Sequence, residues 1–105
     1  MEIILECLDD LDEQAFLLDS PDLSVSNPGF VIGRARDCHL QLASSFVSRH
    51  HCELIPDQTK GALRVRDLGS QNGTYVNDEK IEKEQELRDG DRLTVACVPF
   101  EVHIE

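Results

Sequence analysis

Two arginines and a serine are the groups in this chain best suited to bind an oxyanion. Arg34, Ser48 and Arg49 lie in a stretch, residues 23–52, whose only acid is Asp37. An arginine guanidinium presents a rigid fork of N–H donors that fits a phosphate or a carboxylate, and an adjacent hydroxyl adds a further donor. These residue types predict a binding site for a phosphate or carboxylate group.

A second segment, residues 67–77 with the sequence DLGSQNGTYVN, is rich in hydrogen-bonding groups and carries no charge after Asp67. Asn72-Gly73 is a strong turn dipeptide because both residues tolerate a positive φ angle. The amides of Gln71 and Asn72 can both donate to and accept from a peptide backbone. We therefore expect this turn to contact an extended peptide, and its lack of charge avoids repelling an anionic one.

Catalysis is a weaker interpretation of the same residues. Ser48 with His50 or His51 could form a nucleophile and its base, or the two histidines could bind a metal. However, no third orienting group stands at a recognisable spacing, and no G-x-S-x-G element surrounds the serine. Adjacent histidines in a strand also point to opposite faces. We expect no enzymatic activity, no metal and no cofactor.

The charge of the chain argues against some classes of partner. Ten Lys and Arg against 21 Asp and Glu give a formal net charge of -11, which repels nucleic acid and anionic membranes at long range. No apolar run approaches the roughly 18 residues needed to span a bilayer. Four scattered cysteines without close pairs are typical of free, buried thiols in a reducing compartment. We expect a cytoplasmic protein, or a nuclear one in a eukaryote.

The length of 105 residues suits one compact domain, so we expect a single domain over 1–105. Short apolar or alternating runs recur, and turns are expected at residues 27–29, 56–58, 72–73, 77–78 and 89–91. The expected strands are residues 3–8, 15–18, 29–33, 39–42, 51–55, 63–67, 74–76, 93–97 and 100–104, with weaker candidates at 80–81 and 86–87. About ten or eleven short strands predict an all-β fold, a sandwich of two antiparallel sheets with loops gathered at its ends.

Several short motifs in this order resemble the forkhead-associated (FHA) domain, a β-sandwich of the FHA/SMAD-like kind that binds phosphothreonine peptides through loops at one end. The matching residues are Gly33-Arg34, Ser48 with His51, and the segment from Leu68 to Asn77, with supporting matches at residues 37–38 and 90–93. The resemblance covers about residues 30–104. Each motif is short, but their shared order and spacing argue against chance agreement.

The resemblance implies a role for each matching residue. Phosphate would be bound by Arg34, Ser48 and Arg49, and the peptide backbone by Asn72, Gln71 and Ser70. Phe46, just before the serine, would read the third ligand position after the phosphothreonine, where we expect an apolar preference. A small cavity for the threonine methyl group would disfavour phosphoserine by on the order of 1 kcal/mol. The residues expected to shape the loops are Gly33, His51, Gly69, Gly73, Thr74 and Asn77.

The function implied by the resemblance is phosphorylation-dependent protein–protein interaction in serine/threonine kinase signalling. The partner would be a phosphothreonine-containing protein, either such a kinase or its substrate. A second copy of the chain is another candidate, which would give self-association. The alternative is a phosphate-independent scaffold or dimerisation module of the same fold. The presence of both Arg34 and Ser48 argues against this alternative, because a scaffold has no physical need for that pair.

Overall fold

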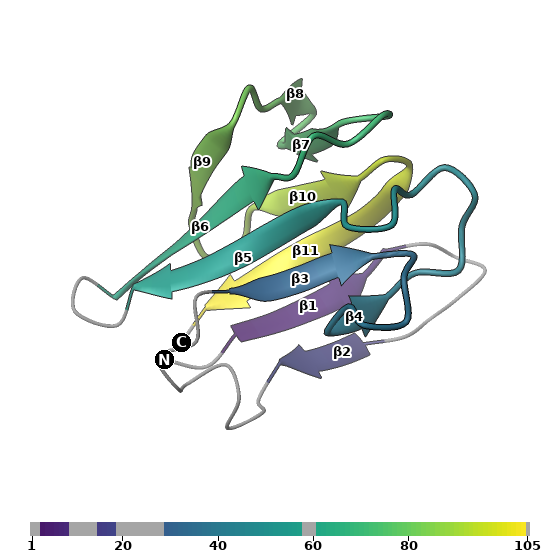
Figure 1. The fold of residues 1–105 in the computed structure, drawn as a ribbon. Coiled ribbons are helices and arrows are strands. Elements are labelled where there is room, and N and C mark those ends of the chain that lie inside the picture. The colour runs from purple at the N-terminus through teal and green to yellow at the C-terminus, as the bar shows by residue number, and fades with distance from the viewer. Residues whose placement is uncertain (1–2, 9–14, 19–28, 58–60, 105) are drawn as a thin grey trace.

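The computed structural model describes residues 3–8, 15–18, 29–57 and 61–104, which form eleven strands in two sheets (Figure 1). The strands are β1 (Ile3–Cys7), β2 (Ala15–Leu18), β3 (Phe30–Gly33), β4 (Leu40–Gln41), β5 (Cys52–Asp57), β6 (Ala62–Asp67), β7 (Thr74–Val76), β8 (Glu79–Lys80), β9 (Glu84–Leu87), β10 (Arg92–Val95) and β11 (Val98–Ile104). One sheet has the order β2-β1-β11-β10-β7-β8, and the other has the order β4-β3-β5-β6-β9. These described residues include no helix that could cross a membrane.

The two sheets pack face to face around one apolar core. Period-two alternation buries Leu5 of β1 together with Phe100 and Val102 of β11 on the inner face of the six-stranded sheet. Leu54 of β5 and Val65 of β6 are buried in the same way on the five-stranded sheet. Burial of each such side chain contributes about 1.5–3 kcal/mol, so this core holds the sheets together. The predicted all-β sandwich is confirmed.

Two local predictions about the strands are wrong, and both have a tertiary cause. β3 and β4 pair in parallel, through Ile32 with Leu40, whereas the other strand pairs among the described residues are antiparallel. The chain loops around through residues 34–39 and returns to the sheet edge in the same direction. β5 continues through Pro56 and Asp57, where a turn was expected, because Leu63 and Ala62 of β6 pair with them. The turn expected at 27–29 lies mostly outside the described residues.

The cysteines are free, as expected, but their burial differs from the prediction. Among the four, only Cys52 is buried, and Cys97 is exposed. Ala96 and Cys97 form the turn of the hairpin between β10 and β11, where Ala96 has a φ angle of 58°. The apolar run that predicted a strand through residue 97 is interrupted by this turn, and a hairpin tip is not covered by either sheet.

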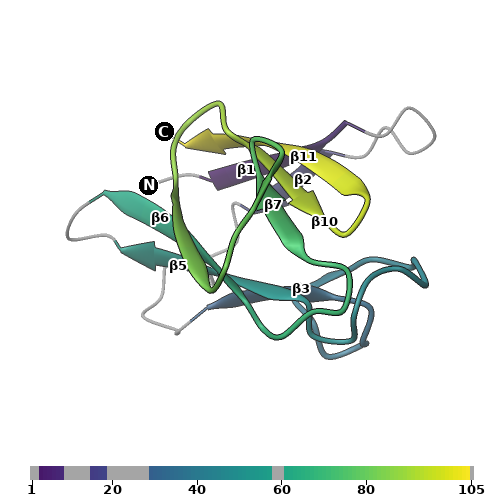
Figure 2. The same ribbon diagram turned by 90° about the horizontal axis from the view of Figure 1, so that it is seen from above.

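Three connections gather at one end of the sandwich (Figures 1 and 2). They are residues 34–39 between β3 and β4, residues 42–51 between β4 and β5, and residues 68–73 between β6 and β7. We call them the first, second and third loops. The start of β1 and the end of β11, which pair Ile3 with Ile104, lie at the opposite end. The segments that carry the predicted site residues are therefore neighbours in space.

Candidate functional site

Backbone hydrogen bonds join the first and second loops directly after β3. The N–H of Arg34 donates to the carbonyl oxygen of Ser48 at 3.0 Å, and the N–H of Ala35 donates to that of Arg49 at 3.1 Å. These bonds continue the pairing of β3 with β5 beyond the ends of the strands. As a result, Arg34, Ser48 and Arg49 lie side by side although the first is distant from the other two in the sequence.

Gly33 permits the close approach of the two loops. A β-carbon at this position would lie 2.1 Å from the carbonyl oxygen of Arg49 and 2.9 Å from Sγ of Cys38. A β-carbon essentially never comes this close to a non-bonded atom, so a larger residue would push the second loop away from β3. The absence of a side chain at Gly33 is therefore what allows the loops that carry Arg34 and Arg49 to pack together.

Arg34 is anchored through one side of its guanidinium. Its Nε donates to the carbonyl oxygen of Val47 at 3.1 Å, and its own carbonyl oxygen accepts from Nε2 of Gln41 at 3.1 Å. Because Nε supplies only one of the five guanidinium N–H groups, the terminal nitrogens remain able to donate to a ligand. Arg34 and Arg49 are exposed, and Ser48 is half-buried. The adjoining loops thus carry two exposed arginines and a half-buried serine.

His51 is fully buried and connects the second loop to the third loop and to β3. Its Nδ1 accepts from the backbone N–H of Ser48 at 3.1 Å, and its Nε2 lies 2.7 Å from the carbonyl oxygen of Gly73. These partners assign the neutral tautomer whose proton is on Nε2 and is donated to Gly73. The backbone of His51 also donates to Ile32 and accepts from Leu68. Both ring nitrogens are therefore occupied by contacts that hold the loops together.

Side chains of the second and third loops form two further connections. Oγ of Ser48 accepts from the backbone N–H of Gln71 at 3.1 Å, and Nδ2 of Asn72 donates to the carbonyl oxygen of Phe46 at 2.7 Å. The hydroxyl proton of Ser48 is not used in the first bond, so it can be donated to a phosphate oxygen. Gln71 and Asn72 are exposed. The structure thus brings the loop that carries the uncharged amides next to the serine.

Asp67 organises the third loop, although its sequence position did not predict it as a site residue. Its carboxylate accepts from the backbone N–H groups of Gly69 and Ser70 at 3.1 and 3.0 Å. It also accepts from the hydroxyls of Ser70 and Thr74 at 2.5 and 2.8 Å. The signal that could have identified it is an aspartate followed two residues later by Gly-Ser, a pattern typical of an Asx turn.

These bonds place Ser70 inside the turn. Its hydroxyl donates to Asp67 and accepts from the backbone N–H of Gly73 at 3.0 Å. Both of these partners lie within the protein, so the Ser70 hydroxyl is already engaged. The expected contact of Ser70 with a peptide stays a prediction. Gly69 and Gly73 have φ angles of 78° and 87°, the left-handed region that favours glycine. The buried Thr74 then begins β7.

The pKa of the Asp67 carboxyl reflects its surroundings. Partial burial acts to raise this pKa, but the hydrogen bonds from Ser70, Thr74 and Gly69 act to lower it and together prevail. The pKa of Asp67 therefore lies below the ordinary carboxyl value. The group is ionised at neutral pH, where its hydrogen bonds hold the third loop in one conformation.

Asn77 and Phe46 lie at the margins of the site. Asn77 has a φ angle of 52° in the turn after β7, and its Oδ1 accepts from the backbone N–H of Arg92 at 3.0 Å. It therefore connects two hairpins of the six-stranded sheet and is not part of the three loops. Phe46 of the second loop is 61% exposed, the only exposed large apolar residue in the described part of the chain. Its ring offers apolar surface close to Ser48.

Comparison with known proteins identifies the family. The FHA domain family matches residues 30–96, which is more than half of the chain. The chain belongs to the FHA domain family. It is 42% identical over 72 residues to the ABC transporter ATP-binding/permease protein Rv1747 of Mycobacterium tuberculosis, covering 68% of this chain and 8% of that protein. The chain therefore spans less than a tenth of the length of this relative.

Solved structures resemble this FHA domain over its whole length. One, from a structural and functional analysis of phosphothreonine-dependent FHA domain interactions, has a TM-score of 0.81 and 28% identity, and the match covers 100% of this chain and 98% of that one. Another is EmbR of Mycobacterium tuberculosis in complex with a low-affinity phosphopeptide. It has a TM-score of 0.81 and 27% identity, and the match covers 99% of this chain and 24% of that one.

FHA domains are binding modules, and the Ser48–His51 geometry in this FHA domain differs from that of a nucleophile with its base. His51 accepts from the backbone N–H of Ser48 and not from its hydroxyl. The other His51 nitrogen donates to Gly73, so neither nitrogen is placed to take the hydroxyl proton. His50 is exposed in the second loop and contacts Asp37. These contacts favour binding over catalysis.

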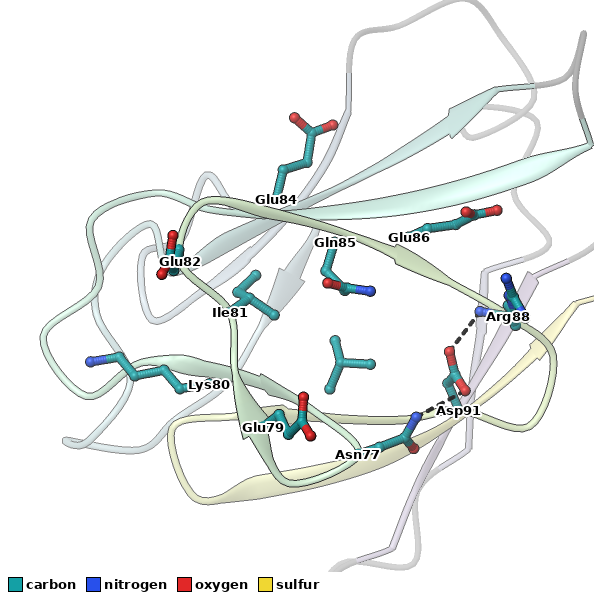
Figure 3. A pocket seen from close by; sticks show the side chains of 11 residues that line it. Asn77, Glu79, Lys80, Ile81, Glu82, Glu84, Gln85, Glu86, Arg88 and Asp91 are labelled. Carbon is teal, nitrogen blue, oxygen red and sulfur yellow. Dashed lines mark hydrogen bonds between the residues drawn. The ribbon is translucent and has the colours of Figure 1, made fainter.

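The FHA domain also has an open hollow between β8 and β9, which are edge strands of the two sheets (Figure 3). Its lining includes five acidic side chains, those of Glu79, Glu82, Glu84, Glu86 and Asp91. In Figure 3 the acids surround the opening, and Asp91 accepts from Asn77 and from the backbone of Arg88. This excess of carboxylates repels a phosphate, and none of the arginines of the first two loops lines the hollow.

Proposed function

We propose that this FHA domain binds phosphothreonine-containing peptides and thereby mediates phosphorylation-dependent protein–protein interaction in serine/threonine kinase signalling. The observation that carries the proposal is that backbone hydrogen bonds bring Arg34, Ser48 and Arg49 together on two adjoining loops, where both arginines are exposed. A phosphothreonine brings about -1.5 to -2 charge and three strong acceptor oxygens. Two guanidinium groups and a hydroxyl match that charge and those acceptors. The similar EmbR structure, which contains a phosphopeptide, supports the same class of ligand.

The third loop would bind the peptide backbone beside the phosphate. Gln71 and Asn72 are exposed and uncharged, and the Gln71 N–H is bonded to the Ser48 hydroxyl oxygen. Amide side chains pair with the N–H and C=O groups of an extended peptide without repelling its phosphate. The exposed ring of Phe46 would contact an apolar side chain at the third position after the phosphothreonine.

The remaining parts of the proposal concern the partner and the setting. The partner is a phosphothreonine-containing protein, a serine/threonine kinase or its substrate, or a second copy of the chain. Residues 1–105 act as one module without enzymatic activity, which the hydrogen bonds of His51 support. The cytoplasm is the proposed compartment, supported by four cysteines that are all unpaired, as is usual in a reducing environment.

The test is a fluorescence-anisotropy titration with degenerate pools of phosphothreonine, threonine and phosphoserine peptides. We expect the phosphothreonine pool to bind, the phosphoserine pool to bind several-fold more weakly and the threonine pool not to bind. Hydrogen bonds to a charged group contribute about 1.5–3 kcal/mol, so Arg34→Ala should weaken binding by about tenfold or more. Arg92→Ala is the matched control, because Arg92 is exposed on β10, outside the three loops.

Two outcomes would contradict the proposal. Equal binding of the phosphorylated and unphosphorylated pools would support the phosphate-independent scaffold. Equal losses of phosphothreonine-peptide affinity in Arg34→Ala and Arg92→Ala would mean that the affinity reflects the overall charge of the protein and not the site on the loops.

A further inference from the structure

A cluster of three metal-ligating side chains lies on the first two loops. Asp37 and Cys38 come from the first loop, and His50 comes from the second. Nε2 of His50 lies 3.0 Å from each carboxylate oxygen of Asp37. With Sγ of Cys38 included, the ligand atoms all lie within 4.8 Å of one another. The cluster thus bridges the two loops that carry Arg34, Ser48 and Arg49.

The donor atoms of the cluster indicate which ion would fit. Zn²⁺ is bound in proteins by thiolate sulfur, imidazole nitrogen and carboxylate oxygen, and this cluster offers one of each. Mg²⁺ and Ca²⁺ prefer sites made of oxygen alone. A thiolate and a carboxylate together balance the charge of a divalent ion. We propose that Asp37, Cys38 and His50 form a binding site for Zn²⁺ that joins the first and second loops.

Small movements of exposed side chains would close this site around the ion. Zinc–ligand bonds of about 2.0–2.3 Å in a tetrahedron place the ligand atoms about 3.3–3.8 Å apart. The 3.0 Å separation of His50 and Asp37 is already near this value. Their side chains are 50% and 74% exposed, so both have room to rotate toward Cys38. Three protein ligands leave a fourth position for water.

Zinc binding would replace one hydrogen bond of the metal-free protein. Sγ of Cys38 lies 3.0 Å from the carbonyl oxygen of Arg49, to which the thiol donates. On binding, the sulfur–zinc bond forms, the S–H bond breaks and the proton goes to solvent. His50 would bind through Nε2 and carry its ring proton on Nδ1. Arg34, Arg36 and Arg49 on the same loops oppose a cation, so we expect weaker binding than at structural zinc sites.

A second cluster on the opposite sheet serves as a control. Glu6 of β1 and Glu101 and His103 of β11 also place three ligand atoms within 4.8 Å of one another. This cluster contains no sulfur donor, and exposed carboxylates of this kind are common without an ion. It allows the contribution of the thiol to be separated from general attraction of cations to an acidic protein.

The test is a calorimetric titration of the metal-free protein with Zn²⁺ alone. We expect one zinc ion per chain, and Cys38→Ser should weaken this binding by about tenfold or more. His103→Ala and Cys97→Ser should bind as the unaltered protein does, because they change the second cluster and an exposed thiol outside both clusters. Titration with Co²⁺ should produce sulfur-to-cobalt charge-transfer absorption that Cys38→Ser abolishes.

Circular-dichroism melts of every variant would show that a loss of binding is not a loss of fold. His50→Ala, at an exposed position, is the second variant and should also weaken zinc binding. Absence of zinc binding in the unaltered protein, or equal binding by Cys38→Ser, would overturn the proposal. No peptide is present in these titrations, so their outcome is independent of whether the domain binds phosphopeptides.

Discussion

Replacing Asp67 with asparagine tests whether one carboxylate holds the third loop. The side chain keeps its shape, but one carboxylate oxygen becomes an NH2 group that cannot accept. Two of the four hydrogen bonds from Gly69, Ser70 and Thr74 are therefore lost, and the other two lose their charged acceptor. A net hydrogen bond to a charged group contributes about 1.5–3 kcal/mol, against about 0.5–1.5 kcal/mol for a neutral pair. Asp67 is half-exposed, so water replaces part of what is lost. We expect Asp67→Asn to lower the free energy of unfolding by about 2 kcal/mol, and the melting temperature by roughly 10 °C.

The assay is urea unfolding at pH 7 followed by far-ultraviolet circular dichroism, since the chain contains no tryptophan. The control is Asp78→Asn, which removes the same charge at an exposed residue whose φ angle of 69° suits asparagine. The urea concentration at the midpoint of unfolding should fall for Asp67→Asn but not for Asp78→Asn. The slope of the unfolding free energy against urea concentration should stay unchanged. A loss below about 0.5 kcal/mol, or an equal loss in the control, would refute the reasoning.

The pH dependence of the same comparison has a definite sign. The pKa of Asp67 is lower in the folded protein than in the unfolded chain, so ionised Asp67 stabilises the fold above the ordinary carboxyl pKa. This stabilisation is lost as the pH falls through the lowered pKa. The difference between the unaltered protein and Asp67→Asn should therefore shrink as the pH falls below about 4. A difference that stays constant from neutral to acid pH would contradict this account.

Two further substitutions separate the roles of loop residues. Gly33→Ala should weaken phosphothreonine-peptide binding in anisotropy titrations by about tenfold or more, because its β-carbon would lie 2.1 Å from the Arg49 carbonyl oxygen and displace that loop. Unchanged affinity would contradict the proposed contact between the loops. Phe46→Ala should change stability by less than about 0.5 kcal/mol, since the residue is 61% exposed. On a peptide array, Phe46→Ala should remove a preference for apolar residues at the third position after the phosphothreonine. If the unaltered protein instead prefers aspartate at that position, the proposed role of Phe46 is refuted.

The strand pattern was readable from the sequence because alternation is a local property. Phe100, Val102 and Ile104 alternate with Glu101 and His103, and this run forms the end of β11 with Phe100 and Val102 in the core. The turns expected at residues 77–78 and 89–91 also form, since backbone preferences at glycine and asparagine depend little on distant residues. Eleven strands in the described residues match the predicted number for this reason.

Predictions that depended on neighbouring strands were less successful. Whether Pro56 belongs to a turn or a strand was decided by pairing with Leu63 across the sheet. The parallel entry of β4 depends on the path of the first loop, which no local pattern records. Cys97 lies in an apolar run, yet the hairpin between β10 and β11 places it at an exposed tip.

The sequence by itself determined the chemistry available to this protein: guanidinium groups at Arg34 and Arg49, a hydroxyl at Ser48 and a turn rich in amides. Only the tertiary structure decided which of these groups meet. The close approach of Gly33 to Arg49 and the bonds of His51 to Gly73 and Ile32 join residues that are distant in the sequence. The same holds for Asp37, Cys38 and His50, which become a cluster when β3 and β5 pair. The physical reason is that residue type and turn preference are local, whereas proximity depends on how the sheets pair and pack.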